Sequence, residues 1–232
     1  MFNLPNVLTL SNLLSGCIAV VALIHGAYDV MYGCFLASLI FDLFDGLAAR
    51  ALKVSSSLGA ELDSLADMVS FGFFPGIVLY TILSTDWTQG FAIISFVGFI
   101  YTISACLRLA KFNIDERQGT DFMGLNTPAA SIAIVGMFAA IQNDCTYASA
   151  LVDTPWLLIG VIVAISILLL ADLPMVSFKP DFSYRSRTLK QGAIVGGALI
   201  LFIWLKSCAL PFIILWYVVF SLANLLLQKS RR

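Results

Sequence analysis

Long apolar segments recur along the chain, and they constrain its fold more than any other feature. A helix that crosses a lipid bilayer needs about 20 mostly apolar residues. Eight segments approximate this length, although the fifth contains Asn143 and Asp144, and the last two can form one hairpin around Lys206. We therefore predict an all-α, polytopic integral membrane bundle of about eight transmembrane helices, which forms a single domain over residues 1–232. The predicted spans are approximately 7–28, 30–52, 60–84, 89–110, 127–146, 155–172, 191–205 and 208–228.

The composition argues against the main classes of soluble protein. Of the 232 residues, 60% are hydrophobic and 12% are charged, and the mean hydropathy is +0.95. Soluble domains are typically about 45–50% apolar and about 25% charged. The net charge is −1, so no overall field attracts nucleic acid. A soluble enzyme, a nucleic-acid-binding protein and a disordered chain are therefore all disfavoured.

Sites built from histidine or cysteine are also disfavoured. The single histidine, His25, lies in an apolar run, and one histidine cannot form a multi-histidine zinc site. The five cysteines form no CxxC pair, and an odd number cannot all pair within the chain. We therefore expect no disulfide framework.

The basic residues indicate the orientation in the membrane. If the N-terminus is cytoplasmic, 12 of the 13 lysines and arginines fall on the cytoplasmic side, and Lys206 falls outside. Cytoplasmic loops of membrane proteins carry such an excess of basic residues. A six-span arrangement without the last hairpin gives the same sidedness. We expect no signal peptide. We predict a multi-pass protein of the cytoplasmic membrane whose N-terminus and active site face the cytoplasm.

Four aspartates lie within the second and third predicted spans, where charge is otherwise avoided. An ionisable residue at the centre of a membrane helix costs about 2.5–3.5 kcal/mol on insertion scales, so such residues are candidates for function. Asp42 and Asp45 share a helical face at a spacing of three residues, and Asp63 and Asp67 share one at a spacing of four. The segment Lys53–Ser57 turns the chain between them. Two antiparallel helices can therefore direct four carboxylates at one point.

Four adjacent carboxylates favour a bound cation, because they repel one another and stay ionised only beside a compensating charge. Oxygen ligands of this kind suit Mg²⁺ or Mn²⁺, and four can hold two ions in a phosphoryl-transfer site. Gly46, Ala49 and Gly59 are small where a ligand must approach the backbone. Arg50 is suited to a phosphate. Two alternatives remain open: a solvated helix end in which the acids pair with Arg50 and Lys53, and a cation transporter, which favours acids nearer mid-membrane.

The spacing of these residues resembles the signature of the CDP-alcohol phosphotransferase family. The stretch from Asp42 to Asp67 reads D-x2-D-G-x2-A-R-x8-G-x3-D-x3-D without a departure. Looser similarity extends over most of the chain, and within the family it is greatest to the phosphatidylserine synthase branch. The stretches that carry this second similarity are PNVLTLSNLLSG (5–16), LADMVSFGFFPG (65–76), CLRLAKFN (106–113) and GLNTPAAS (124–131).

The resemblance implies a reaction and a site. In this branch, the phosphatidyl group of CDP-diacylglycerol passes to the hydroxyl of L-serine, and CMP is released. At the matching positions, Asp42, Asp45 and Asp63 would bind Mg²⁺ or Mn²⁺, and Asp67 would lie at the metal and act as the general base. The resemblance also implies a six-helix core, to which the C-terminal hairpin is added, and a homodimer. The residues implied to line the CDP site are Gly46, Ala49, Arg50 and Gly59.

Three further residues are candidates for substrate contacts. Every third residue from Asn6 to Ser15 is polar. These residues can bind the nucleotide, for which Asn12 is the best candidate, or they can equally well form hydrogen bonds between helices. Arg108 ends the fourth span and is a candidate for the carboxylate of serine. Asn126 opens the fifth span and is placed to face the same site.

Proteins with other functions would show different sequence or biochemical features. A family member that uses glycerol phosphate or inositol phosphate would need a larger basic pocket. A membrane prenyltransferase is also rich in aspartate and dependent on Mg²⁺, but it would lack the glycine, alanine and arginine positions of the signature. An ion carrier would release no CMP.

Overall fold

The structure is a computed structural model that describes residues 3–54, 56–84, 93–114, 122–175 and 185–229. The chain divides into two compact units, residues 1–115 and 116–232. In the described ranges both units are built from helices, with one pair of two-residue strands in the second unit. The predicted all-α, polytopic membrane fold is thereby confirmed, and the prediction of a single domain stays a prediction.

Within the described residues, four helices are long and apolar enough to cross a membrane, and all four lie in the first unit. A bent pair, Thr146–Asp153 with Pro155–Leu170, would make a fifth span. Three shorter apolar helices cover Thr127–Gln142, Gln191–Leu205 and Leu210–Leu225. The predicted count of eight spans is therefore not established. The four long helices are Leu4–Ile24, Tyr28–Leu52, Ser57–Ser84 and Ile93–Ile114.

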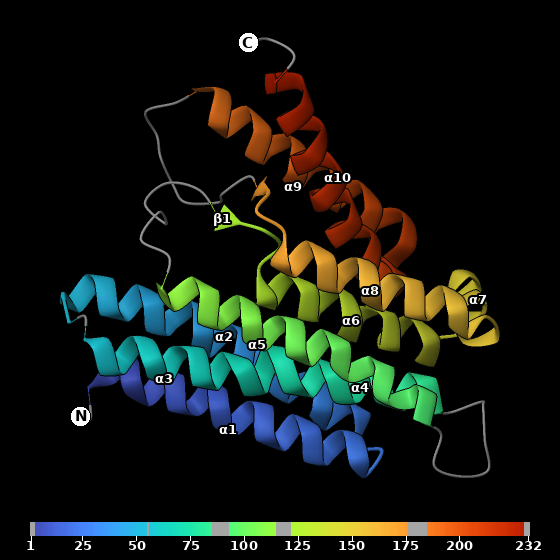
Figure 1. Ribbon diagram of the computed structural model, residues 1–232, viewed down its shortest axis with the longest axis horizontal. Coiled ribbons are helices and arrows are strands. Elements are labelled where there is room, and N and C mark those ends of the chain that lie inside the picture. Colours follow the sequence, from blue (N-terminus) through green and yellow to red (C-terminus); the bar gives the residue numbers. More distant parts are fainter. Residues whose placement is uncertain (1–2, 55, 85–92, 115–121, 176–184, 230–232) are drawn as a thin grey trace. The chain divides into compact units, whose positions relative to one another are not determined.

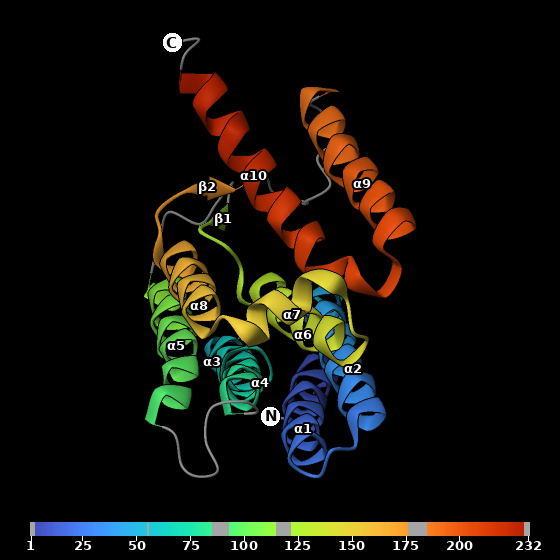
Figure 2. The same ribbon diagram turned by 90° about the vertical axis from the view of Figure 1, so that its right-hand side faces the viewer.

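The first unit is a bundle whose long helices run side by side (Figure 1) and are seen nearly end-on in Figure 2. Helix α1 packs along α2, and it also contacts α3, the following π-helix η1 and α4. Helix α5 contacts α3, η1 and α4. In chain order the elements are α1 (Leu4–Ile24), α2 (Tyr28–Leu52), α3 (Ser57–Asp67), η1 (Met68–Phe73), α4 (Phe74–Ser84), the 3₁₀ helix η2 (Ile93–Gly98) and α5 (Phe99–Ile114).

Local sequence explains where α1 begins and ends. The side chain of Asn3 accepts a hydrogen bond from the backbone N–H of Asn6 at 3.0 Å, which caps the free N-terminus of the helix. Pro5 stands in the first turn, where its missing N–H needs no partner. Gly26 follows the C-cap with φ of +68°, a conformation that glycine adopts without strain. The chain then re-enters the bundle as α2.

A short turn reverses the chain between α2 and α3. Lys53 ends α2 in the left-handed region, with φ of 53°, and the Val54 N–H bonds to the Ala49 carbonyl at 3.1 Å. Ser56 starts α3 by accepting a hydrogen bond from the Gly59 N–H at 3.0 Å. The turn therefore sets the two aspartate-bearing helices antiparallel, as the sequence predicts.

The third long helix contains a π-helical segment, Met68–Phe73, that the sequence pattern does not predict. Pro75 follows it and has no N–H to donate to the carbonyl of Phe71. That carbonyl instead accepts a hydrogen bond from the buried Tyr101 hydroxyl at 2.7 Å, and Thr102 donates to the Gly72 carbonyl at 3.1 Å. Helix α5 therefore satisfies the backbone groups where the π-helix passes into α4.

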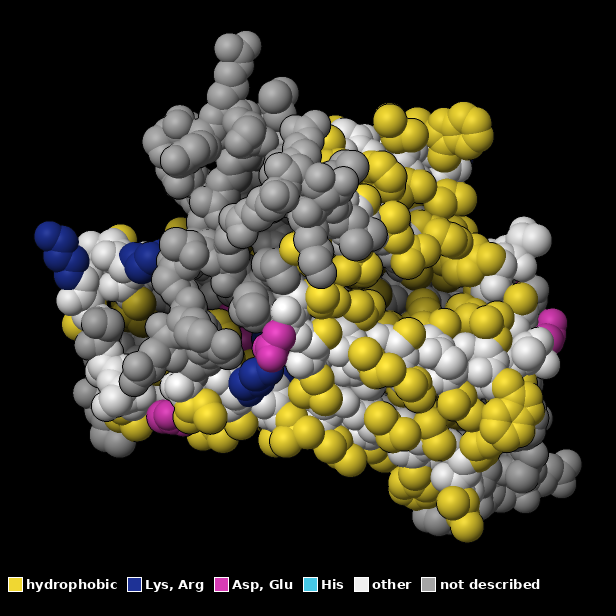
Figure 3. Space-filling model, turned by 45° about the horizontal axis from the view of Figure 1, so that its top comes forward, with side chains coloured by type: hydrophobic (Ala, Val, Ile, Leu, Met, Phe, Trp, Pro, Cys, Tyr) yellow, Lys and Arg dark blue, Asp and Glu magenta, His cyan; other side chains and the backbone are white. Residues whose placement is uncertain are grey.

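Hydrophobic side chains form both the core and much of the surface of the first unit. Met31, Phe71 and Phe74 are fully buried or nearly so. Large apolar side chains such as Leu14 and Leu43 are more than half exposed, which suits helices that face lipid. Hydrophobic side chains cover much of the face drawn in Figure 3.

The second unit consists of helices and one short strand pair. Helix α10 packs on α6 and α9, and α8 contacts α6 and α7. The strands pair antiparallel, with Phe122 opposite Met175 and Met123 opposite Pro174. In chain order the elements are β1 (Phe122–Met123), α6 (Thr127–Gln142), α7 (Thr146–Asp153), α8 (Pro155–Leu170), β2 (Pro174–Met175), α9 (Arg185–Leu205), the 3₁₀ helix η3 (Lys206–Cys208) and α10 (Leu210–Lys229).

A disulfide in this unit corrects the expectation from the cysteine count. Cys145 and Cys208 are bonded across 63 residues of sequence, with their Cα atoms 6.2 Å apart. Cys145 precedes α7, Cys208 ends η3, and the Tyr147 hydroxyl donates to the Cys208 carbonyl at 2.8 Å. The number and spacing of the cysteines do not reveal this pair, because packing of α6 against η3 brings the two residues together. Cys17, Cys34 and Cys106 are free thiols.

Candidate functional site

Three of the four predicted aspartates converge within the first unit. One carboxylate oxygen from each of Asp42, Asp63 and Asp67 can be chosen so that all three lie within 4.8 Å of one another. Asp42 comes from α2, and the other two come from α3, one helical turn apart. Asp67 is 8% exposed, whereas Asp42 and Asp63 are partly exposed. Three carboxylate oxygens at this spacing can share one divalent cation, whose ligands lie about 2.0–2.6 Å from the ion. We call these residues the aspartate triad.

The fourth aspartate is placed differently. Asp45 lies three residues after Asp42 on α2 and is buried, and its Oδ2 accepts a hydrogen bond from the Thr9 hydroxyl of α1 at 2.7 Å. Asp45 is outside the triad but lines a cavity together with Asp63. The structure thus sets three carboxylates together and directs the fourth to the adjoining cavity.

That cavity has a volume of about 190 Å³ and lies between the start of α1 and the turn that joins α2 to α3. Three of the small residues that the sequence singles out, Gly46, Ala49 and Gly59, line it. A Cβ added to Gly59 would lie 3.1 Å from the Ser56 hydroxyl oxygen, so glycine keeps this wall open. The full lining is Pro5, Asn6, Thr9, Asp45, Gly46, Ala49, Val54, Ser56, Gly59, Ala60 and Asp63.

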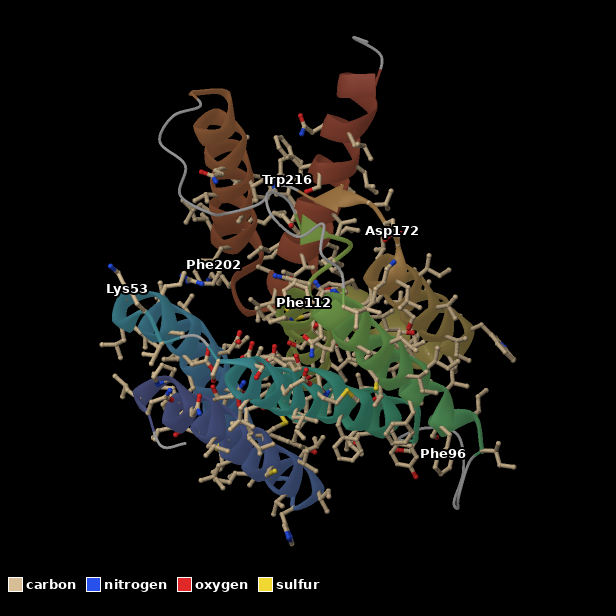
Figure 4. The ribbon with its side chains drawn as sticks, turned by 60° about the vertical axis from the view of Figure 1, so that its left-hand side comes forward. Lys53, Phe96, Phe112, Asp172, Phe202 and Trp216 are labelled. Atoms are coloured by element: carbon tan, nitrogen blue, oxygen red, sulfur yellow. A yellow bond between two sulfur atoms is a disulfide. The ribbon has the colours of Figure 1, made fainter. Side chains whose placement is uncertain are left out.

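The two cations of the turn are exposed. The Arg50 guanidinium folds back over Gly46, and one of its nitrogens lies 3.5 Å from the position that a Cβ would take there. Lys53 points away from the helix pair, whereas oxygen atoms gather along α3 (Figure 4). Among the described residues, neither cation forms an ion pair with an aspartate. The alternative in which Arg50 and Lys53 neutralise the carboxylates therefore gains no support.

Asn12 lies against the triad and does not line the cavity. Its side chain is fully buried, and its Nδ2 donates a hydrogen bond to Asp67 Oδ1 at 3.1 Å. The sequence shows the polar stripe of α1 but does not indicate that its members Thr9 and Asn12 donate hydrogen bonds to aspartates. These two hydrogen bonds depend on how α1 packs against α2 and α3, and the sequence pattern of a single helix cannot predict them.

The two residues proposed for serine lie in different units. Arg108 is on α5 of the first unit and is 8% exposed. This burial distinguishes it from a basic residue that only anchors a helix end in water. Nearby, the Ser64 hydroxyl of α3 donates to Asn113 Oδ1 of α5 at 2.9 Å, which ties the two helices beside the triad. Asn126 is in the second unit, where it caps α6 by accepting from the Ala129 N–H at 3.1 Å. Its serine-binding role stays a prediction.

Comparison with known proteins gives one family. A family model described as CDP-alcohol phosphatidyltransferase matches residues 2–177. A CDP-diacylglycerol–serine O-phosphatidyltransferase of Mycobacterium tuberculosis is 28% identical over 230 residues, which cover 94% of this chain and 74% of the relative. The Bacillus subtilis enzyme of the same name is 33% identical over 137 residues, which cover 57% and 73%. That of Methanocaldococcus jannaschii is 34% identical over 149 residues, which cover 62% and 67%.

Proposed function

The chain belongs to the CDP-alcohol phosphatidyltransferase family, and from that premise we propose that it transfers the phosphatidyl group of CDP-diacylglycerol to L-serine, giving phosphatidylserine and CMP. The observation that carries the proposal is the aspartate triad beside a cavity walled by Gly46, Ala49 and Gly59. The choice of serine is supported by the names of the similar proteins.

The residues of the site fit a divalent metal. The triad offers carboxylate oxygens, which Mg²⁺ and Mn²⁺ prefer, and its spacing of 4.8 Å or less suits one ion. Asp45 adds a fourth carboxylate at the cavity wall, so we propose that the four aspartates hold two ions. When bound, the metal supplies positive charge to the diphosphate of the substrate and to the departing CMP.

The cavity suits the nucleotide end of the lipid. Its glycine and alanine walls admit a diphosphate close to the backbone of α2 and α3. Arg50 lies directly over Gly46, and its guanidinium offers paired N–H donors to phosphate oxygens. We therefore assign Gly46, Ala49, Arg50 and Gly59 to CDP binding.

Asp67 is proposed as the general base. A carboxylate that lies within hydrogen-bond reach of the serine hydroxyl can take its proton during attack. The serine oxygen then forms a bond to the β-phosphorus of CDP-diacylglycerol, the bond from that phosphorus to the bridging oxygen breaks, and CMP departs with the electron pair. Arg108, which is buried on α5, the helix that packs against α3, is proposed to hold the serine carboxylate.

The reaction explains why the site lies in a membrane protein. One substrate is a lipid and the other dissolves in water, so both must reach one point near the headgroup boundary. We propose that the N-terminus and the aspartates face the cytoplasm in the cytoplasmic membrane, as the basic residues indicate. A homodimer is proposed from the family resemblance.

A panel of acceptors tests the proposed function. The purified protein is incubated with CDP-diacylglycerol, Mn²⁺ and, separately, serine, glycerol phosphate and inositol phosphate, and both CMP and lipid product are measured. We expect CMP and phosphatidylserine in equal amounts with serine alone. Product formation with another acceptor would overturn the choice of serine, and the absence of CMP with every acceptor would overturn the phosphatidyl transfer.

A further inference from the structure

Asn12 makes one side-chain hydrogen bond in the described structure, and that bond reaches the proposed base. Its Nδ2 donates to Asp67 Oδ1 at 3.1 Å, across 55 residues of sequence. The Oδ1 of Asn12 is buried and has no hydrogen-bond partner among the described residues. Buried polar side chains that serve packing alone are usually satisfied, so a half-satisfied amide beside a carboxylate cluster indicates a role at the site.

The backbone of Asn12 is fixed from two directions. The Ser70 hydroxyl of η1 donates to the Asn12 carbonyl at 3.0 Å. The Ser38 hydroxyl of α2 shares its proton between the Asn12 carbonyl at 3.3 Å and the Cys34 carbonyl at 3.1 Å. Ser38 lies one turn before Asp42, and Ser70 lies one turn after Asp67. The backbone of Asn12 is therefore bonded to α2, which carries Asp42, and to η1, which directly follows Asp67.

We propose that Asn12 is a positioning residue that orients the Asp67 carboxylate. Because one oxygen of Asp67 accepts the bond from the Asn12 amide, rotation of the carboxylate is restricted and its direction toward Asp42 and Asp63 is kept. Groups that hydrogen-bond to metal ligands in this way typically change metal affinity or activity about 10–100-fold when they are removed. The inference rests on the proposed function, because it deepens the role given to Asp67, and it replaces the nucleotide contact predicted for Asn12.

Three single variants test the inference. Asn12→Ala removes the donor, and Asn12→Leu removes it while keeping most of the side-chain volume. Ser38→Ala is the matched control, because it removes a buried hydrogen bond to the same residue and leaves the amide of Asn12 in place. For each variant we would measure thermal unfolding, Mn²⁺ affinity by calorimetry, and kcat and KM for both substrates.

Both Asn12 variants are expected to lose about 10–100-fold in kcat or in Mn²⁺ affinity, with KM for CDP-diacylglycerol little changed. Ser38→Ala should lose much less of both properties than either Asn12 variant, because Ser70 still donates to the Asn12 carbonyl. In addition, the double variant of Asn12→Ala and Asp67→Asn should lose about as much kcat as Asp67→Asn alone, because the Asn12 amide acts through the Asp67 carboxylate.

Two results would overturn the inference alone. A raised KM for CDP-diacylglycerol with kcat retained would make Asn12 a nucleotide contact, and losses equal to those of Ser38→Ala would make it structural. If the wild-type protein neither binds Mn²⁺ nor releases CMP in the presence of serine, the proposed function fails, and the inference that rests on it fails as well.

Discussion

The surroundings of each aspartate suggest a different role for each side chain. Asp42 and Asp63 are partly exposed within the triad, whereas Asp67 is buried and accepts a hydrogen bond from Asn12. Asp45 is bonded to Thr9 at the cavity wall. The spacing of the four aspartates predicts that they share helical faces in two pairs. It does not predict how their surroundings differ, because these depend on polar side chains of α1 that lie far away in the sequence.

Asp67→Asn separates proton transfer from metal binding. Asparagine keeps the size of the side chain and one oxygen but cannot take the proton from serine as a carboxylate does. General-base catalysis is typically worth about 10²–10⁴-fold, so we expect a loss of that size in kcat with CDP-diacylglycerol binding retained. The measurement is turnover beside calorimetric lipid affinity across a Mn²⁺ titration. Normal turnover, or recovery by added Mn²⁺, would place the base elsewhere.

Arg108→Ala tests recognition of the acceptor. Loss of a charged hydrogen bond typically costs about 1.5–3 kcal/mol, so KM for serine should rise roughly 10–100-fold while KM for CDP-diacylglycerol changes little. Steady-state kinetics with each substrate varied in turn gives both values. Lys111→Ala, on the same helix, is the control and should alter neither. Equal increases for both substrates after Arg108→Ala would contradict a contact with serine.

At the scale of the element, apolar length predicts the first three spans closely. The expected span 60–84 is observed as Ser57–Ser84, and the turn after α2 lies at Lys53 as predicted. The π-helix is not predicted, because the backbone groups that it leaves open are satisfied by Tyr101 and Thr102 of a different helix. Helix α5 also extends to Ile114, past the predicted end at 110, and Asn113 in this extension bonds to Ser64.

Gly16→Ala tests how closely α1 must approach the π-helix. A Cβ at Gly16 would meet the side chain of Ser70 and lie 2.9 Å from its Cα, so the two elements must separate. Overpacking of this kind costs about 1–3 kcal/mol, and we expect a lower unfolding temperature in detergent together with reduced turnover. Gly33→Ala on α2 is the control, because nothing lies within 4 Å of its added Cβ. Equal unfolding temperatures for both variants would contradict the close packing.

At the scale of the whole molecule, the sequence predicts the membrane class and the family, and it leaves the number of spans open. Apolar length identifies the four long helices of the first unit directly. The helices of the second unit are shorter or bent, so length alone does not decide which of them cross the membrane. The sequence does not predict the Cys145–Cys208 disulfide, because the positions of cysteines along the chain do not show which of them meet in space.

The disulfide provides a test of the predicted topology. The charge distribution places the loops around Cys145 and Cys208 on the outer side, where an oxidising environment favours disulfides. In a variant whose Cys17, Cys34 and Cys106 are replaced by serine, a membrane-impermeant maleimide added to intact cells should label the protein only after reduction. Labelling without reduction would contradict the disulfide. Labelling that requires permeabilised cells would contradict the orientation.

The dependence of phosphatidyl transfer on metal tests the central claim most directly. The protein is stripped with EDTA, Mn²⁺ is titrated back in the presence of CDP-diacylglycerol and serine, and CMP release is followed for the wild type and for Asp42→Asn. We expect no turnover without metal and full recovery with Mn²⁺ in the wild type. Because Asp42→Asn lacks one carboxylate of the triad, its curve should shift to higher Mn²⁺ concentration. Undiminished turnover of the stripped protein, or identical curves for the two proteins, would contradict the account.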